Sequence, residues 1–147
     1  MTIIIRPTEK KDLSQLLPFL ESYIVDFYKQ PKPNQIHLKE LILKLSQKEI
    51  GVQFVAIKDS QLVGFATLYF TYSTLRVAPV TVMNDLFILE NYRGQGIATD
   101  LFQICEAYTR DHNYAYMSWI TSSDNHNAQT FYQKMGATKG NWIGYLT

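Results

Sequence analysis

The spacing of apolar residues changes along the chain and separates helical from extended segments. Apolar residues recur every three or four positions over 12–27, 38–45 and 97–113, as in helices with one buried face. Runs rich in β-branched and large apolar residues cover 3–6, 51–58, 62–70 and 79–89, as in mostly buried strands. The pattern after residue 113 predicts a strand over 114–120, a helix over 125–136 and a closing strand over 142–146.

Breaker residues indicate where these elements end. Pro18 lies inside the first helical segment and should kink or divide it, because proline removes a backbone donor and clashes with the preceding turn. A stiff connection follows over 30–34, and 59–61 is short enough to close a hairpin. The order β-α-α-β-β-β-α-β-α-β predicts one mixed, mostly antiparallel sheet flanked by helices, an α/β sandwich of the α+β class.

Composition favours one domain over residues 1–147. The chain has 147 residues, of which 46% are hydrophobic, which is enough for a single core. Its net charge of +1, from 14 basic and 13 acidic residues, gives no electrostatic footprint for nucleic acid or an anionic membrane. The N-terminal residues lack a basic leader and no apolar run reaches about 18 residues, so neither secretion nor membrane spanning is expected.

Cysteine and histidine usage indicates neither disulfides nor a metal. The single cysteine, Cys105, lies on the apolar face of the helix over 97–113, so we expect a core position and a reducing, cytoplasmic environment. The three histidines are not spaced to share a helix face, and no cysteine or acidic cluster accompanies them: His37, His112 and His126.

Residues 93–98, Arg-Gly-Gln-Gly-Ile-Ala, lie between a predicted strand and a predicted helix. The first N–H groups of a helix have no carbonyl partner, and with the positive end of the helix dipole they attract an anion. Gly94 and Gly96 lack a Cβ, so the backbone can approach a phosphate oxygen. The layout is typical of a phosphate-binding turn, and a purely structural glycine turn is the alternative.

Two common nucleotide loops do not match this segment. A P-loop ends in Gly-Lys-Ser/Thr, whereas Ile97 and Ala98 follow Gly96 here. A dinucleotide fingerprint needs three spaced glycines in an early βαβ unit, and only two glycines are present. The remaining pattern, Arg-x-x-Gly-x-Ala over 93–98, resembles the acetyl-CoA pyrophosphate loop of the GCN5-related N-acetyltransferase (GNAT) superfamily.

A second motif points to the same family. Residues 125–136 follow Asn-x-x-Ala-x-x-Phe-Tyr-x-x-x-Gly, which resembles the second GNAT signature. By itself the motif predicts a short helix with Ser123 or Asp124 as its N-cap and Gly136 as its stop. Both motifs occur in the family's order, so the resemblance covers most of the chain and implies the acyl-CoA N-acyltransferase fold.

The resemblance implies acetyl-CoA as co-substrate, without a metal, and names residues for each of its parts. Backbone amides of one loop would hold the pyrophosphate: Arg93, Gly94, Gln95, Gly96, Ile97 and Ala98. The strand backbone at Leu86, Phe87 and Ile88 would pair with the pantetheine arm and supply an oxyanion-binding N–H. Asn125 matches a position that hydrogen-bonds the pantetheine region or caps its helix.

Catalytic groups follow from the chemistry of acetyl transfer. Tyr132 matches the family's general acid, which reprotonates the coenzyme A thiolate; outside the motif it reads as a core tyrosine. An alkyl ammonium of pKa about 10.4 loses its proton at pH 7 at a cost of about 4 to 5 kcal/mol, so a base or water chain is needed. Asp85 is the first candidate and Glu90 the second, and either could instead orient water or substrate. Glu21 and Asp26 are further candidates, or part of a solvated helix face.

Two further resemblances bear on the acceptor. Residues 62–72 with 91–97 look like diamine (spermidine/spermine) acetyltransferases, and 119–121 ahead of 125–129 is similar to the yeast histone/polyamine type. They imply a small primary amine such as a diamine, polyamine or amino acid. Asn84 departs from the diamine branch, which carries a glutamate there. A protein or peptide amine, or a non-catalytic acyl-CoA-binding module, are the alternatives, and the family resemblance implies a homodimer formed through the C-terminal strand.

Overall fold

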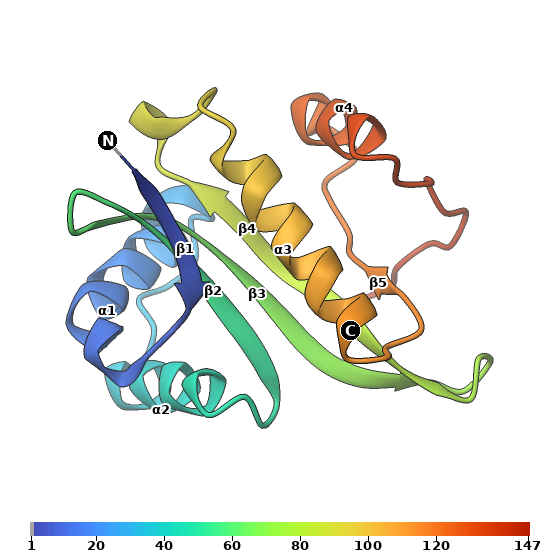
Figure 1. Cartoon of the computed structure of the whole chain (residues 1–147), viewed down its shortest axis with the longest axis horizontal. Coiled ribbons are helices and arrows are strands. Elements are labelled where there is room, and N and C mark those ends of the chain that lie inside the picture. Colours follow the sequence, from blue (N-terminus) through green and yellow to red (C-terminus); the bar gives the residue numbers. More distant parts are fainter. Residues whose placement is uncertain (1) are drawn as a thin grey trace.

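A five-stranded sheet in the order β1-β2-β3-β4-β5 forms the centre of the computed structural model, which describes residues 2–147 (Figure 1). The strands are β1 Ile3–Pro7, β2 Gly51–Lys58, β3 Gln61–Ser73, β4 Ala78–Ile88 and β5 Met117–Ser118. Strands β1 to β4 pair antiparallel, and β5 pairs parallel to β4. The predicted mixed, mostly antiparallel sheet is confirmed.

Helices cover both faces of the sheet. They are α1 Leu13–Ser22, α2 Gln35–Ser46, α3 Ile97–Asp111 and α4 His126–Lys134, with 3-10 turns η1 Lys10–Asp12 and η3 Glu90–Tyr92 and a π-helical turn η2 Tyr23–Phe27. Helices α1 and α2 lie on one face and α3 on the other, while α4 follows β5 at the edge of the molecule (Figure 1). This confirms the α+β class.

The first helical segment continues through Pro18, where the sequence predicts a kink or a division. Pro18 and Ser14 are both exposed, so water can reach the helix where the Ser14 carbonyl loses its N–H partner. The regular α-helix ends at Ser22 and widens into the π-helical turn η2. The division therefore lies after Ser22 rather than at Pro18.

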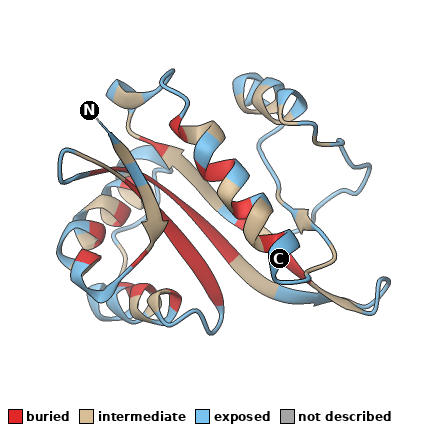
Figure 2. Ribbon diagram, in the orientation of Figure 1, coloured by how far each residue is buried: buried red, intermediate tan, exposed pale blue. Residues whose placement is uncertain are grey.

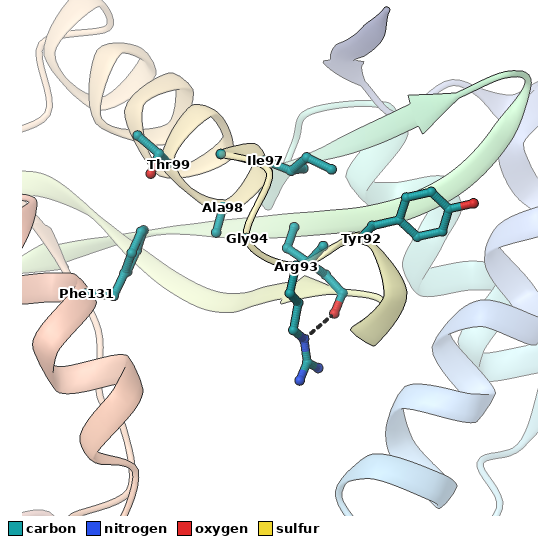
Figure 3. Close-up of a pocket in the computed structure, with 9 residues that line it drawn as sticks. Tyr92, Arg93, Gly94, Ile97, Ala98, Thr99 and Phe131 are labelled. Carbon is teal, nitrogen blue, oxygen red and sulfur yellow. Dashed lines mark hydrogen bonds between the residues drawn. The ribbon is translucent and has the colours of Figure 1, made fainter. Parts of the chain in front are cut away.

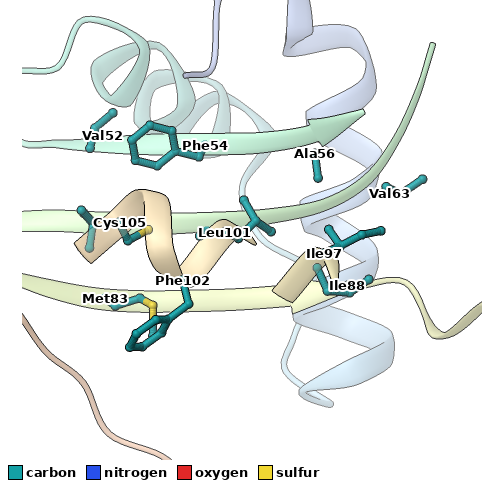
Figure 4. Close-up of a cluster of buried hydrophobic side chains, with 12 residues drawn as sticks. Val52, Phe54, Ala56, Val63, Met83, Ile88, Ile97, Leu101, Phe102 and Cys105 are labelled. Carbon is teal, nitrogen blue, oxygen red and sulfur yellow. The ribbon is translucent and has the colours of Figure 1, made fainter. Parts of the chain in front are cut away.

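Two apolar layers hold the sheet between the helices. On one face Leu101, Phe102 and Cys105 of α3 pack against β2, β3 and β4 (Figure 4). Burial raises the pKa of the Cys105 thiol to about 12, so it stays protonated at neutral pH, and its predicted core position is confirmed. On the other face α1 and α2 bury Leu16 and Ile42 against the sheet.

The C-terminal part departs from the prediction. The strand predicted over 114–120 shrinks to Met117–Ser118, which pairs with Thr81 and Val82. The closing strand predicted over 142–146 is wrong, because residues 137–147 form no helix or strand and 138–147 are exposed (Figure 2). A strand needs a hydrogen-bonded neighbour, and within residues 2–147 no segment pairs with 142–146.

Candidate active site

A sharp turn between β4 and α3 presents free backbone amides. Gly94 and Gly96 adopt φ values of 77° and 83°, which glycine reaches without strain. The first helical bond of α3 runs from Asp100 N–H to the Gly96 carbonyl (3.0 Å), so the three preceding N–H groups have no partner in the helix. A Cβ on either glycine would meet no atom within 4 Å. The positive end of α3 therefore faces open space.

A cavity of about 180 Å³ opens on this turn (Figure 3). Its lining comes from the end of β4, the turn, the first turn of α3 and α4: Ile88, Tyr92, Arg93, Gly94, Gly96, Ile97, Ala98, Thr99 and Phe131. The structure thus gathers the predicted pyrophosphate-binding residues around one space, apart from Gln95. The Gln95 side chain accepts a hydrogen bond from Lys58 Nζ (3.2 Å).

Two cationic side chains flank the turn. Lys58, at the end of β2, lies 37 residues from Gln95 in the sequence, and its ammonium is 5.6 Å from the centre of the Tyr92 ring. Arg93 folds back so that its Nε donates to the Ile88 carbonyl (2.9 Å), as Figure 3 shows. Sequence reasoning missed Lys58, since no local motif connects it to the loop.

Strand β4 has an open edge beside the cavity. Only Thr81 and Val82 pair with β5 in the part of the chain that the structure describes, so residues 83–88 keep one edge without a strand partner. Leu86, Phe87 and Ile88, the predicted pantetheine-binding residues, fall in this stretch. An open strand edge can receive another extended chain through main-chain hydrogen bonds.

A β-bulge interrupts β4 at Asn84. Thr67 pairs with Asp85, while the next residue on β3, Leu68, pairs with Met83, so Asn84 has no partner on β3. Bulges re-aim side chains and occur frequently beside active sites. Here the bulge precedes the predicted base, Asp85, whose side chain reaches the π-helical turn η2.

Two hydrogen bonds hold the Asp85 carboxylate. The Tyr23 hydroxyl donates to Oδ1 (3.0 Å), and Asn84 Nδ2 donates to Oδ2 (3.2 Å). Burial, and then the Asp85 charge, raise the pKa of the Tyr23 phenol, so Tyr23 remains a donor at neutral pH. Each carboxylate oxygen can accept more than one hydrogen bond, so Asp85 can also accept a hydrogen bond from a ligand. Sequence reasoning missed Tyr23, which has an ordinary place in the helical pattern.

Tyr132 lies on α4 among aromatic side chains. Its ring centre is 5.1 Å from that of Trp119 and 6.4 Å from that of Phe102. Burial, and then the neighbouring Tyr28 phenol, raise the pKa of Tyr132, so its hydroxyl is protonated at neutral pH. A general acid needs this protonation state.

Tyr28 packs beside the tyrosine that contacts Asp85. Its ring centre is 5.0 Å from that of Tyr23, whose hydroxyl contacts Asp85. Asn84, which donates to the Asp85 carboxylate, and Tyr132 line one open groove between β4 and α4.

The other carboxylates proposed as bases have different surroundings. Glu21 forms an ion pair with Lys32 (3.5 Å), and Asp26 accepts a hydrogen bond from Ser22 Oγ (2.9 Å). Glu90 begins η3, ahead of the glycine turn. Of these carboxylates, Asp85 alone lies on β4 and is bonded to Asn84, which lines the same groove as Tyr132.

Asn125 caps α4. Its Oδ1 accepts a hydrogen bond from Ala128 N–H (3.1 Å). The structure therefore shows the capping role of Asn125, and the predicted caps at Ser123 or Asp124 are wrong. The predicted stop at Gly136 is confirmed, because this residue follows α4 with φ of 85°.

Two classes of feature are absent from residues 2–147. No group of three or more histidine, cysteine, aspartate or glutamate side chains is arranged to hold a metal ion. No helix combines the length and hydropathy that crossing a bilayer requires.

Fold and site together define an acyl-CoA N-acyltransferase architecture: an antiparallel sheet whose fourth strand ends in a glycine turn and a helix N-terminus. The chain belongs to the Acetyltransferase (GNAT) family, whose model matches residues 17–137. It is therefore an acetyltransferase. The resemblance to the diamine and yeast polyamine branches within this family is not confirmed.

Relatives and solved structures agree with this assignment. The chain is 25% identical over 132 residues to the uncharacterized N-acetyltransferase YhfO of Bacillus subtilis (strain 168), covering 90% of this chain and 87% of that one. It is 25% identical to an aminoglycoside N(6')-acetyltransferase type 1 of Acinetobacter genomosp. 13, covering 82% and 88%. The crystal structure of a probable acetyltransferase superposes with a TM-score of 0.83 at 26% identity, covering 100% and 97%. Aminoglycoside N-acetyltransferase AAC(6')-Iy in complex with CoA shares the fold, with a TM-score of 0.81 at 19% identity, covering 99% and 94%.

Proposed function

We propose that residues 1–147 act as one catalytic domain, an acetyl-CoA-dependent N-acetyltransferase that moves the acetyl group directly to a primary amine of a small molecule. The observation that carries the proposal is the turn between β4 and α3. Its free amides and its cavity of about 180 Å³ lie beside the open edge of β4. A long thioester that carries a pyrophosphate suits this combination of an anion site and an extended edge.

Each part of the reaction has a residue in this proposal. Bound acetyl-CoA would supply the acetyl thioester. The amides following Gly96, assisted by Lys58, hold the pyrophosphate. Asp85 holds the substrate ammonium and takes one proton from it, directly or through water, so that a neutral amine attacks the thioester carbonyl. The nitrogen releases its second proton to solvent as the C–N bond forms. Tyr132 gives its proton to the sulfur as the C–S bond breaks.

Small-molecule amines are the proposed acceptors, with diamines, polyamines and amino acids as the first classes to test. Relatives named as aminoglycoside acetyltransferases support a small-molecule acceptor. The resemblance of residues 62–72 and 91–97 to diamine acetyltransferases supports the diamine class. The net charge of +1 gives no sign of a strongly acidic groove, so polyamines, which are polycations, are the weakest of the three classes.

The proposed function is tested by release of the coenzyme A thiol from acetyl-CoA with a panel of amines, amino acids and peptides, alongside calorimetric binding of acetyl-CoA. We expect binding and turnover on at least one small amine. Turnover on peptides alone would indicate a protein acetyltransferase. Binding without turnover would indicate a non-catalytic acyl-CoA-binding module.

A homodimer in the reducing cytoplasm is the proposed working state. Trp142, Tyr145 and Leu146 are 88%, 94% and 99% exposed, an unusual surface for side chains of this size. An open groove of about 1560 Å³, lined by β4, α3, β5 and α4, reaches Trp142. In a two-fold dimer, segment 142–146 of each copy would pair with an extended segment of the other at the Trp142 end of this groove, away from Tyr132, and gain the strand partner that it lacks here.

A further inference from the structure

The π-helical turn η2 gathers aromatic rings around Phe87 of β4. The ring centres of Tyr23 and Phe27 each lie 5.0 Å from that of Phe87. The Tyr28 ring is perpendicular to both Tyr23 and Phe27, with centres 5.0 Å away. Wide turns of this kind occur frequently at functional sites. We call Tyr23, Phe27, Tyr28 and Phe87 the aromatic cluster.

The outer part of the aromatic cluster is open to solvent. Phe27 and Tyr28 are 49% and 54% exposed, whereas Tyr23 is buried and donates to Asp85 (3.0 Å). Exposed aromatic surface thus packs against a buried tyrosine that contacts a carboxylate. Neither the apolar packing of α1 nor the cofactor cavity requires rings at these two exposed positions.

One cationic side chain already lies against a ring of the aromatic cluster. The guanidinium carbon of Arg93 lies 5.5 Å from the centre of the Phe87 ring. Aromatic faces attract cations at such distances through their quadrupole. A ligand ammonium beside Phe27 and Tyr28 would gain the same attraction and, in addition, the charge of Asp85.

We propose that Asp85 and the exposed rings of Phe27 and Tyr28 bind the acceptor, and that this acceptor is an amine with one positive charge and an apolar body. The inference rests on the proposed function and narrows its acceptors to amines of a single positive charge, which leaves out diamines and polyamines. One carboxylate balances one ammonium, and the rings offer apolar surface to the remainder. Of the other acidic residues of α1 and η2, Glu21 is paired with Lys32, and Asp26 is hydrogen-bonded to Ser22 of α1 rather than to a member of the aromatic cluster. An aminoglycoside carries several ammonium and hydroxyl groups that this surface would leave unpaired.

The test uses benzylammonium as the probe and measures its binding to the full chain by calorimetry in the presence of coenzyme A. Benzyl alcohol is the uncharged counterpart, and tobramycin is the polycation. We expect benzylammonium to bind at least about tenfold more tightly than either, and Phe27→Leu to weaken its binding about 3- to 10-fold. Tyr72→Leu replaces a ring that is 78% exposed at the far end of β3 and should change nothing.

Kinetics separate this inference from the proposed function. With benzylamine as acceptor, Phe27→Leu should raise the KM for the amine and leave the KM for acetyl-CoA unchanged. Three results would overturn the inference: equal binding of benzyl alcohol and benzylammonium, unchanged benzylammonium affinity in Phe27→Leu, or tighter binding of tobramycin. The proposed function would stand in each case as long as the chain still turned over acetyl-CoA. Failure of acetyl-CoA to bind would overturn both.

Discussion

Tyr23 shows how a residue with an ordinary place in a helical pattern gains a contact at the candidate site. The pattern over 12–27 predicts which residues of α1 face the sheet, and this holds for Leu16 and Leu20. It contains no information about Asp85, which is 62 residues away in the sequence and contacts Tyr23 through the sheet. Lys58 and Tyr28 were missed for the same reason, because their neighbours are set by tertiary structure.

Replacing Tyr132 with phenylalanine removes the proposed general acid. We expect Tyr132→Phe to lower kcat by about two orders of magnitude, the usual scale for losing such a group, with acetyl-CoA affinity near normal. Thiol release and calorimetry measure the two quantities. Tyr72→Phe removes an exposed hydroxyl and serves as the control. An unchanged kcat in Tyr132→Phe would remove the role from this residue.

The pH dependence of the rate tests the protonation state of Tyr132. The pKa of Tyr132 is raised above about 10, the ordinary pKa of tyrosine, so the phenol stays protonated up to that pH. Deprotonation of Tyr132 should therefore lower the rate only above about pH 10. Initial rates between pH 7 and 10.5, with circular dichroism to verify folding, give the profile. A falling limb well below pH 10 that disappears in Tyr132→Phe would contradict this expectation.

Tyr23 acts as a positioning residue for Asp85 in this account. Tyr23→Phe keeps the ring and removes the hydrogen bond to a charged group, so we expect kcat/KM for the amine to fall about tenfold. The KM for acetyl-CoA should not move. Tyr69 also lies near the Asp85 charge but makes no hydrogen bond to it in the described structure, so Tyr69→Phe is the matched control. Equal effects of the two variants would refute the positioning role.

At the scale of elements, the sequence predicts helices and turns whose ends are marked by nearby residues. It does not predict features that depend on which strand lies alongside. Helix α4 and the turn before α3 follow from glycines and capping residues within a few positions, although the cap of α4 is Asn125 rather than Ser123 or Asp124. The segment 142–146 is rich in aromatic and branched apolar residues, but such a composition cannot supply a neighbouring strand. The bulge at Asn84 likewise depends on register with β3 and leaves no local signal.

The junction between β1 and α1 depends on an ion pair. Arg6 donates to both oxygens of Asp12 (2.7 and 2.8 Å), and Glu9 N–H donates to Asp12 Oδ2 (2.7 Å). The hydrogen bonds from Arg6 lower the pKa of Asp12 in the folded chain below the unfolded value of about 3.9. The charged Asp12 therefore stabilises the fold fully above about pH 3.9, and this stabilisation is lost as the pH falls through the pKa of the folded chain.

Urea unfolding at pH 7 and pH 3 checks this sign. We expect Asp12→Asn to destabilise the chain by about 1 to 3 kcal/mol at pH 7 and by less at pH 3, where Asp12 begins to protonate. Asp111→Asn, on the exposed end of α3, is the control. An equal loss at both pH values would show that the charge of Asp12 is not what matters.

At the scale of the whole molecule, the exposed apolar side chains of segment 142–146 are the basis of the proposed dimer. Multi-angle light scattering should report a dimer for the full chain, and deleting residues 141–147 should shift it to a monomer. Trp142→Ser with Leu146→Ser should have the same effect without shortening the chain. A full-length chain that is monomeric at all concentrations tested would contradict the proposed dimer.

The central claim, that acetyl-CoA binds at the turn before α3, is tested most directly by calorimetry on a matched pair of variants. Asparagine and aspartate have the same shape and both tolerate the φ of 83° at Gly96, so Gly96→Asn and Gly96→Asp differ in charge at the proposed pyrophosphate site. We expect the natural chain to bind acetyl-CoA and Gly96→Asp to bind at least about tenfold more weakly than Gly96→Asn, since a carboxylate repels phosphate at short range. No binding by the natural chain, or equal affinities for the two variants, would contradict the claim.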